Sequence, residues 1–232
     1  MELSDAMRTC AAHRAFAEDT VPDAVVHSVL DDARFAPSGG NRQPWRVVVV
    51  KDPSLKEKIA RAYELGWREY MAFVRAGLVP FAPGPDGAQA ASPVDLRAAR
   101  LEPVDDDFSQ VVATAPVLLL VVCHLPSLAV TDNDLGRQSI VGGASIYPFC
   151  HNVLLAARSR GLGGVMTTVL CRSEERVNEL LAVPPGYGLA GLVVLGWPRR
   201  QPTRLRRRLV EEFSTVDSFE GRSFSLENPS QG

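Results

Sequence analysis

The stretch Ala36-Pro37-Ser38-Gly39-Gly40-Asn41-Arg42-Gln43-Pro44-Trp45 lies between an amphipathic run, residues 22–35, and a bare apolar run, residues 47–50. Its two adjacent glycines let the backbone approach a ligand closely or adopt positive φ. A proline near each end fixes φ and stiffens the segment. Between the prolines lie a hydroxyl, two carboxamides and a guanidinium (Ser38, Asn41, Gln43, Arg42). This composition predicts a loop that presents oriented donors and acceptors to a planar polar ligand; a plain helix-to-strand turn is the alternative.

The segments on either side of this loop have clear periodicity. The preceding run opens at Pro22 and predicts a helix with one buried face. That face carries apolar residues at helical spacing: Val25, Val26, Val29, Leu30 and Ala33. The following run, residues 46–50, is rich in β-branched residues and predicts a strand buried on both faces.

Similar patterns predict the remaining elements. Helices are expected at residues 4–12 with Ser4 as N-cap, at 55–78, at 93–100, and at 173–181 with Ser173 in the cap. The longest amphipathic helix is expected after Gly142-Gly143, ending near Ser159. Strands are expected at 115–123 and 189–196, with a strand or extended loop at 163–171. The aspartates at 105–107 suit a solvated face or a helix N-terminus, and their spacing does not suit a metal loop.

Composition narrows the class of protein. Hydrophobic residues make up 46% and charged residues 22% of 232 positions, which is an ordinary globular mixture. The formal net charge of −2 argues against a nucleic-acid partner. The four cysteines form no C-x-x-C, so neither a zinc site nor a disulfide framework is expected. The first ten residues hold no apolar run, and the longest apolar stretch, residues 115–123, is too short to span a bilayer. The sequence therefore predicts a cytoplasmic protein with no membrane partner and no metal.

Two strings in the chain resemble the FMN-dependent nitroreductase family: PSGGNRQPW at 37–45 and NVLLAARSRGLGG at 152–164. The resemblance implies an α+β fold, with a central, mostly antiparallel sheet flanked by helices. It also implies an intertwined homodimer with FMN at the subunit interface. One nitroreductase-like domain would span residues 1–232, with a lid or flexible insert at 80–95 and an extended C-terminal tail at 213–232.

The same resemblance implies which residues contact the cofactor. A basic segment near the N-terminus and a basic residue after the last strand would hold the FMN phosphate. The loop quoted above would reach the flavin bound mainly by the other subunit, and residues 166–168 would lie near the ring. The implied FMN-binding residues are Arg8, Arg14, Pro37, Ser38, Gly39, Asn41, Gln43, Met166, Thr167, Thr168, Arg204 and Arg206. Ala11 departs from the pattern, because many relatives have an arginine there.

The implied activity is two-electron transfer from NADH or NADPH through FMN to a small-molecule acceptor such as a nitroaromatic or quinone, by a ping-pong mechanism. The flavin performs the chemistry, so no side chain is assigned as a catalytic acid, base or nucleophile. Two alternatives remain. One is a flavoenzyme of the same fold with a dedicated natural-product oxidation or dehalogenation. The other, suggested by Ala11, is a degenerate non-catalytic flavin-binding protein.

Three segments have two interpretations each. The aromatic cluster at residues 67–73 is either core packing or a mobile wall over the flavin. The proline- and glycine-rich residues 80–87 are either a lid or plain disorder. The last twenty residues, 213–232, lack any period and either drape over a neighbouring molecule or are disordered.

Overall fold

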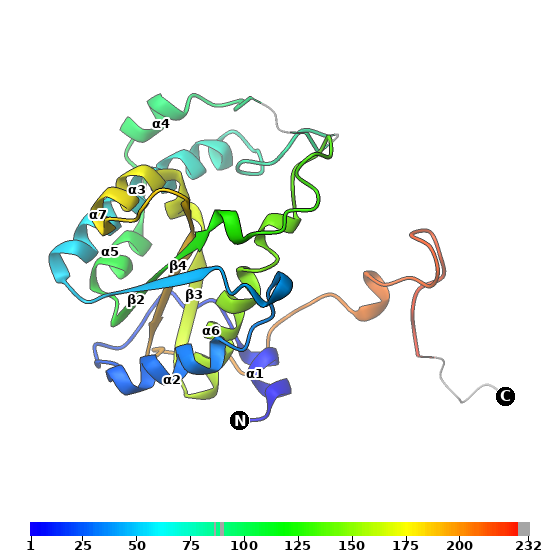
Figure 1. Ribbon diagram of the computed structural model, residues 1–232, viewed down its shortest axis with the longest axis horizontal. Coiled ribbons are helices and arrows are strands. Elements are labelled where there is room, and N and C mark those ends of the chain that lie inside the picture. The colour runs from blue at the N-terminus through cyan, green and yellow to red at the C-terminus, as the bar shows by residue number, and fades with distance from the viewer. Residues whose placement is uncertain (86, 89–90, 227–232) are drawn as a thin grey trace.

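The computed structural model describes residues 1–85, 87–88 and 91–226. The helices are α1 (Leu3–Thr9), α2 (Asp23–Ala33), α3 (Pro53–Arg75), α4 (Leu96–Leu101), α5 (Asp107–Thr114), α6 (Tyr147–Ser159) and α7 (Glu174–Leu181). The strands are β1 (Trp45–Val50), β2 (Val117–His124), β3 (Gly163–Thr167) and β4 (Tyr187–Gly196). Helices pack on both faces of the central sheet (Figure 1). The α+β class expected from the sequence is confirmed.

The sheet has the strand order β1-β2-β4-β3, and every neighbouring pair is antiparallel. β2 and β4 occupy the centre, where Val117 pairs with Leu195 and His124 with Tyr187. β1 and β3 form the two edges. The N-terminal segment runs beside the β3 edge, because Ala12 forms an isolated bridge with Gly164. This arrangement brings the predicted phosphate-binding segment next to the strand that carries Met166 and Thr167.

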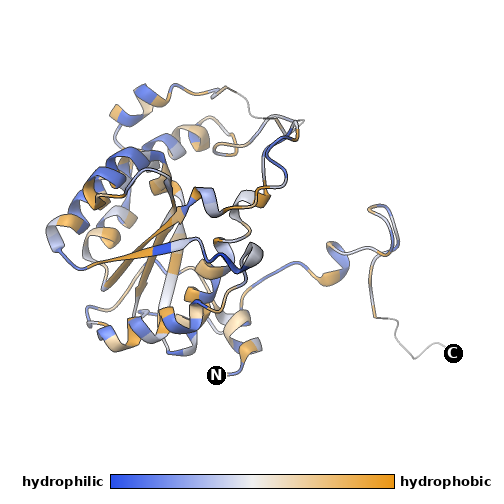
Figure 2. Ribbon diagram, viewed as in Figure 1, coloured by the Kyte–Doolittle hydropathy of each residue, from blue (hydrophilic) through white to orange (hydrophobic). Residues whose placement is uncertain are grey.

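Alternate residues of β2 point into two separate cores. Leu119 and Val121 pack with α2 and α6 on one face, whereas Leu118 and Leu120 pack with α3, α5 and α7 on the other. This is the period of two that a strand imposes on its side chains. All four side chains are fully buried, and apolar colour accordingly runs along the central strands (Figure 2).

Two expectations for the first elements were wrong. β1 is not buried on both faces: Arg46 and Val49 are exposed, because β1 lies at an edge of the sheet and, among the described residues, has a neighbouring strand on one side alone. α1 ends at Thr9 rather than Ala12, and its N-cap residue is Glu2 rather than Ser4. The Thr9 hydroxyl donates to the backbone oxygen of Asp5 one turn earlier.

Three further expectations about helices and strands need correction. The longest helix in the described residues is α3, with 23 residues, whereas α6 has 13. Ser173 does not cap α7 with its side chain; its hydroxyl donates to the backbone oxygen of Ala62 in α3 instead. The segment 163–171, expected as a strand or extended loop, is a strand only as far as Thr167 and continues as a 3₁₀ turn, Val169–Ser173. No helix of the described residues has the length and hydropathy needed to cross a bilayer.

The region between α3 and α5 packs back onto the body through charged and aromatic contacts. Glu69 is 2% exposed and pairs with both Arg100 of α4 and Arg172 of the 3₁₀ turn after β3. The Phe81 ring lies 4.7 Å from the Phe73 ring and beneath the Arg172 guanidinium. Within the predicted lid, Phe81 therefore packs on the body; residues 86, 89 and 90 lie outside the described residues.

After β4 the chain first returns past the N-terminal segment, where Pro198 bridges Phe16 and the Gln201 amide donates to the Thr9 backbone oxygen. It then leaves the body and extends away from it (Figure 1). It carries a short 3₁₀ turn, Val210–Glu212, and a bridge between Thr215 and Ser223. Phe219 and Leu226 are each 93% exposed, which is unusual for large apolar side chains. The part of the predicted tail after residue 226 lies outside the described residues.

Candidate functional site

A cavity of about 590 Å³ opens where β3 ends and the chain turns into the 3₁₀ segment. Its walls come from the N-terminal segment, the middle of α3, the start of α5 and the end of β3. The lining residues are Arg14, Tyr63, Trp67, Tyr70, Asp105, Asp106, Asp107, Phe108, Met166, Thr167, Thr168 and Val169. Four residues predicted to contact the cofactor are thus brought together here: Arg14, Met166, Thr167 and Thr168.

Aromatic rings of α3 form one wall of this cavity. The Trp67 and Tyr70 rings stack with centroids 5.1 Å apart and planes 10° from parallel. Tyr63 continues the row, 6.5 Å from Trp67. The Trp67 indole donates to the backbone oxygen of Asp105, which holds this wall against the start of α5. Trp67 and Tyr70 of the aromatic cluster line the cavity, whereas Phe73 is core, as the packing interpretation predicts.

The acidic residues between α4 and α5 lie beside the aromatic wall. Asp106 is the N-cap of α5, and its Oδ1 accepts hydrogen bonds from the backbone nitrogens of Phe108 and Ser109. Its Oδ2 is buried without a hydrogen-bond partner among the described residues. Burial raises the pKa of the Asp106 carboxyl above its usual value. Burial and the nearby Asp106 charge also raise the pKa of Tyr63 to about 12, so its hydroxyl stays protonated at neutral pH.

Arg14 is the cation of the cavity. Its guanidinium carbon lies 5.9 Å from the centroid of the Phe108 ring, within the range of a cation–π contact. It makes no ion pair with a carboxylate in the part of the chain that the structure describes. The side chain is exposed, so its charge is available to a ligand.

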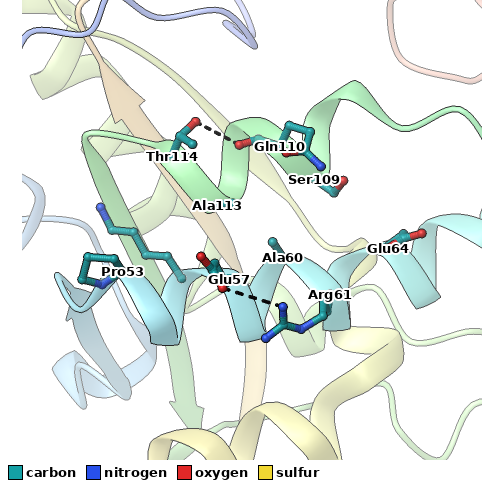
Figure 3. Close-up of a pocket in the computed structure, with 10 residues that line it drawn as sticks. Pro53, Glu57, Ala60, Arg61, Glu64, Ser109, Gln110, Ala113 and Thr114 are labelled. Carbon is teal, nitrogen blue, oxygen red and sulfur yellow. Dashed lines mark hydrogen bonds and ion pairs between the residues drawn. The ribbon is translucent and has the colours of Figure 1, made fainter.

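A second hollow, a groove of about 600 Å³, lies between α3 and α5 (Figure 3). It contains an ion pair of 3.8 Å between Glu57 and Arg61, and Thr114 bonds to the Gln110 backbone beside it. None of the residues predicted to bind the cofactor lines this groove. We therefore place the candidate site in the cavity beside β3.

The loop at residues 37–43 is held by its own hydrogen bonds. The Gln43 backbone nitrogen donates to the Ser38 hydroxyl at 2.9 Å, and the Gln43 amide donates to Asn41 Oδ1 at 3.2 Å. Three positive φ angles make the turn, at Gly40 (59°), Asn41 (52°) and Gln43 (47°). The Gly39 nitrogen donates to the Ser145 hydroxyl just before α6. The loop therefore presents exposed amide groups on a fixed backbone.

None of the loop residues lines the cavity beside β3 in the same chain. Pro37, Ser38, Gly39, Asn41 and Gln43 form a second group near the start of α6. Arg8 lies exposed on α1, and Arg204 and Arg206 lie exposed on the C-terminal extension. The predicted site residues thus fall into separate groups within one chain.

Sequence reasoning missed several residues of the cavity, above all Tyr63, Asp106 and Phe108. Tyr63 is on the same helix face as Trp67 and Tyr70, so the helical period of the aromatic cluster could have included it. Asp106 was expected only as a solvated or helix-terminal residue. Its place in the cavity depends on how α5 packs on α3, which no local pattern reveals.

A family model for the nitroreductase family matches residues 8–197, which include the loop, the cavity and the whole sheet. The chain belongs to the nitroreductase family. The prediction drawn from PSGGNRQPW is thereby confirmed at the level of the family.

Proteins similar in sequence include iodotyrosine deiodinase 1 of Rattus norvegicus, which is 29% identical over 202 residues. The match covers 86% of this chain and 64% of the deiodinase, so the chain spans less than two thirds of that relative. A crystal structure of iodotyrosine deiodinase bound to FMN and 3-iodo-L-tyrosine aligns with a TM-score of 0.65 at 23% identity, covering 94% of this chain and all of that one. The NADPH:FMN oxidoreductase of Vibrio harveyi, complexed with NAD+, aligns with a TM-score of 0.64 at 18% identity, covering 94% and 78%.

Proposed function

We propose that this nitroreductase-family protein is an FMN-dependent oxidoreductase that accepts electrons from NADH or NADPH and reduces a small aromatic acceptor such as a nitroaromatic or a quinone. The observation that carries the proposal is the cavity that unites Arg14 with Met166, Thr167 and Thr168. The resemblance implies that all four contact FMN, and Arg14 is far from residues 166–168 in the chain. The FMN named in the deiodinase structure and the dinucleotide named in the Vibrio structure support the cofactor and the electron donor.

The residues around the cavity fit a flavin. A row of near-parallel rings at Tyr63, Trp67 and Tyr70 suits a planar aromatic group. The hydroxyls of Thr167 and Thr168 and nearby backbone amides are donors for the polar edge of such a ring. Met166 adds a polarizable side chain at the same edge. A volume of about 590 Å³ lies in the usual range for a small-molecule site.

Once bound, FMN would supply two-electron chemistry, and the chain's own residues would bind it, orient it and limit its contact with water. Arg14 would place one end of the cofactor, and residues 166–168 would place its ring. No residue needs to act as a general acid or base in this scheme. Because one cavity would serve both the nicotinamide and the acceptor, the two would enter in turn, and initial-rate plots should give parallel lines. Intersecting lines with a demonstrable ternary complex would contradict the shared cavity.

A homodimer completes the proposal. The amide groups of the loop at 37–43 are exposed and do not reach the cavity of their own chain. A second copy could bring its loop to this cavity, so that each site draws residues from two chains. The exposed apolar side chains of the C-terminal extension, including Phe219 and Leu226, also favour burial against a neighbouring copy.

Dehalogenation of an iodinated phenol is the second candidate, because the deiodinase matches the chain in both sequence and fold. Two assays on the FMN-loaded protein separate the candidates. NAD(P)H oxidation driven by menadione or nitrofurazone supports the first, and iodide release from 3-iodotyrosine with dithionite as reductant supports the second. A protein that binds FMN but does neither would favour a dedicated oxidation or a non-catalytic role. A protein that cannot take up FMN would contradict the proposal.

A further inference from the structure

One carboxyl in the wall of the candidate site has no counter-ion. Asp106 lines the cavity beside β3, and no cation pairs with it among the residues that the structure describes. Its Oδ1 is committed to the first turn of α5, where it accepts from the Phe108 and Ser109 nitrogens at 3.0 and 3.1 Å. Its Oδ2 is buried and has no hydrogen-bond partner in the same part of the chain. Ionisation of this carboxyl is therefore costly, and a bound proton removes that cost.

Helix α3 places further acidic groups beside Asp106. Burial, and to a smaller extent the charge of Glu64, raise the Asp106 pKa; Glu64 has its own counter-ion, Arg68, one turn along the helix. Tyr63 and Tyr70 also line the cavity. Burial and the Asp106 charge raise the pKa of Tyr63 to about 12, so this hydroxyl keeps its proton at neutral pH. Of Asp106 and Tyr63, Asp106 is thus the group that exchanges a proton between acid and neutral pH.

The other elements around the cavity supply charges of a different kind. The N-terminal segment contributes Arg14, and arginine stays protonated in proteins. Asp105 and Asp107 are exposed, so water and salt screen their charges. The end of β3 contributes Met166 and Thr167, which carry no charge. Asp106 therefore differs from the other acidic residues of the cavity by combining a buried oxygen with the lack of a counter-ion.

Reduction of a flavin in this cavity would change the charge that Asp106 experiences. A hydride brings two electrons and one proton to a neutral flavin ring, so the ring gains one negative charge. An ionised Asp106 in the same cavity would repel that charge, and the repulsion is screened less in a buried wall than in water. A proton bound to Asp106 removes the repulsion. The coupling is reciprocal, because protonation of Asp106 favours reduction to the same extent as reduction favours protonation.

We propose that Asp106 takes up one proton from solvent when the flavin in this cavity is reduced, and returns it to solvent when the flavin is oxidised. The inference rests on the proposed function and adds a redox-linked proton site to it. The hydride comes from NADH or NADPH and the additional proton from water, so atoms and charges balance. Asp106 needs no contact with the flavin, because its charge acts across the cavity.

The proposal fixes how the reduction potential of bound FMN depends on pH. In acid, Asp106 is neutral with either form of the flavin and does not oppose reduction. At high pH it is ionised with both forms and lowers the potential. Between these limits the protein takes up one more proton with each pair of electrons than it would without this carboxyl.

The test counts these protons. Reduction potentials of the FMN-loaded protein are measured against indicator dyes from about pH 5 to 8. Asp106→Asn keeps a side chain that caps α5 but cannot ionise. Over part of the range the wild type should take up one more proton per two electrons than Asp106→Asn. That difference is tenfold in the equilibrium constant per pH unit, or about 30 mV. At the alkaline end Asp106→Asn should have the higher potential.

The matched control is Asp95→Asn. Asp95 caps α4 in the same way, with Oδ1 accepting from the Arg97 and Ala98 nitrogens, but it does not line the cavity. This variant should take up as many protons as the wild type. Asp106→Ser is a second variant that keeps a capping side chain and cannot ionise, and it should behave like Asp106→Asn. Thermal unfolding shows which variants are folded.

Infrared difference spectra, reduced minus oxidised, observe the proton directly. A band of a protonated carboxyl should appear on reduction of the wild type and of Asp95→Asn, and it should be missing from Asp106→Asn. The same band in folded Asp106→Asn would assign the proton to another carboxyl and overturn the inference.

The remaining outcomes are distinct. An unchanged proton count in folded Asp106→Asn and Asp106→Ser would overturn the inference and leave the proposed function intact. An equal change in Asp95→Asn would trace the effect to net charge and would also overturn it. A chain that takes up no FMN would refute the proposed function, and the inference with it.

Discussion

Glu69 and Arg172 form an ion pair with 2.7 Å between Oε2 and Nε, and the carboxylate is only 2% exposed. Arg100 pairs with the other oxygen, Oε1, at 2.6 Å. Glu69 belongs to α3, Arg100 to α4, and Arg172 to the turn that follows the cavity residues of β3. One buried carboxylate thus connects α3, which carries the aromatic wall, to the turn after β3 on the other side of the candidate site.

Glu69→Gln should destabilise the protein. The substitution keeps the size of the side chain but leaves two partly exposed guanidiniums without their shared anion. We expect a loss of about 1–3 kcal/mol in the free energy of unfolding, measured by urea denaturation. The control is Glu57→Gln, which removes an exposed pair with Arg61 on the same helix and should cost less than about 1 kcal/mol. Equal effects of the two substitutions would show that the ion pairs of Glu69 stabilise the protein no more than an exposed ion pair does.

Asn41→Gly should weaken FMN binding, because the loop amide would be lost while the positive φ at this position is still allowed. The expected loss is about 1–3 kcal/mol, roughly five- to 150-fold in the dissociation constant. Asn41→Ala removes the same amide but adds strain at positive φ. Unchanged FMN affinity in Asn41→Gly would show that the loop is only a turn between α2 and β1.

Asp106→Asn should raise stability at neutral pH. The folded state holds the Asp106 pKa above its ordinary value of 3.8, so ionisation of this carboxyl opposes folding. Its favourable contribution is present below about pH 4 and is lost as pH rises through the folded pKa. Asparagine keeps the cap of α5 and removes the charge. Urea denaturation from pH 4 to 7 should show that the variant's free energy of unfolding increases relative to that of the wild type as pH rises. A difference that does not change with pH would show that ionisation of Asp106 does not affect stability.

Asp132→Asn should show the opposite pH dependence. Asp132 accepts hydrogen bonds from the Ile140 and Val141 nitrogens, the Ser139 hydroxyl and the Arg137 guanidinium. The Ile140 hydrogen bond, followed by those from the Ser139 and Arg137 side chains, holds its pKa well below the usual range. Its stabilisation is therefore present above about pH 4 and is lost as the pH falls through the folded pKa. The same denaturation series should show the variant less stable at pH 7 and closer to the wild type in acid.

The sequence predicted those elements whose signal lies in a short run of neighbouring residues. The period of α2, the apolar run of β2 and the string PSGGNRQPW led to the right elements and the right family. The edge position of β1 could not be predicted from its valines, because exposure depends on strand order. The cavity that Arg14, Lys56 and Arg199 line could not be predicted either, because it forms only where the chain returns past Phe16 after β4.

A flavin site built from two copies of the chain can be tested by sedimentation velocity of the FMN-loaded protein at micromolar concentration, monitored at the visible flavin absorbance. We predict that the flavin sediments with a species of twice the chain mass, at one flavin per chain. Flavin that sediments with a stable monomer would contradict it.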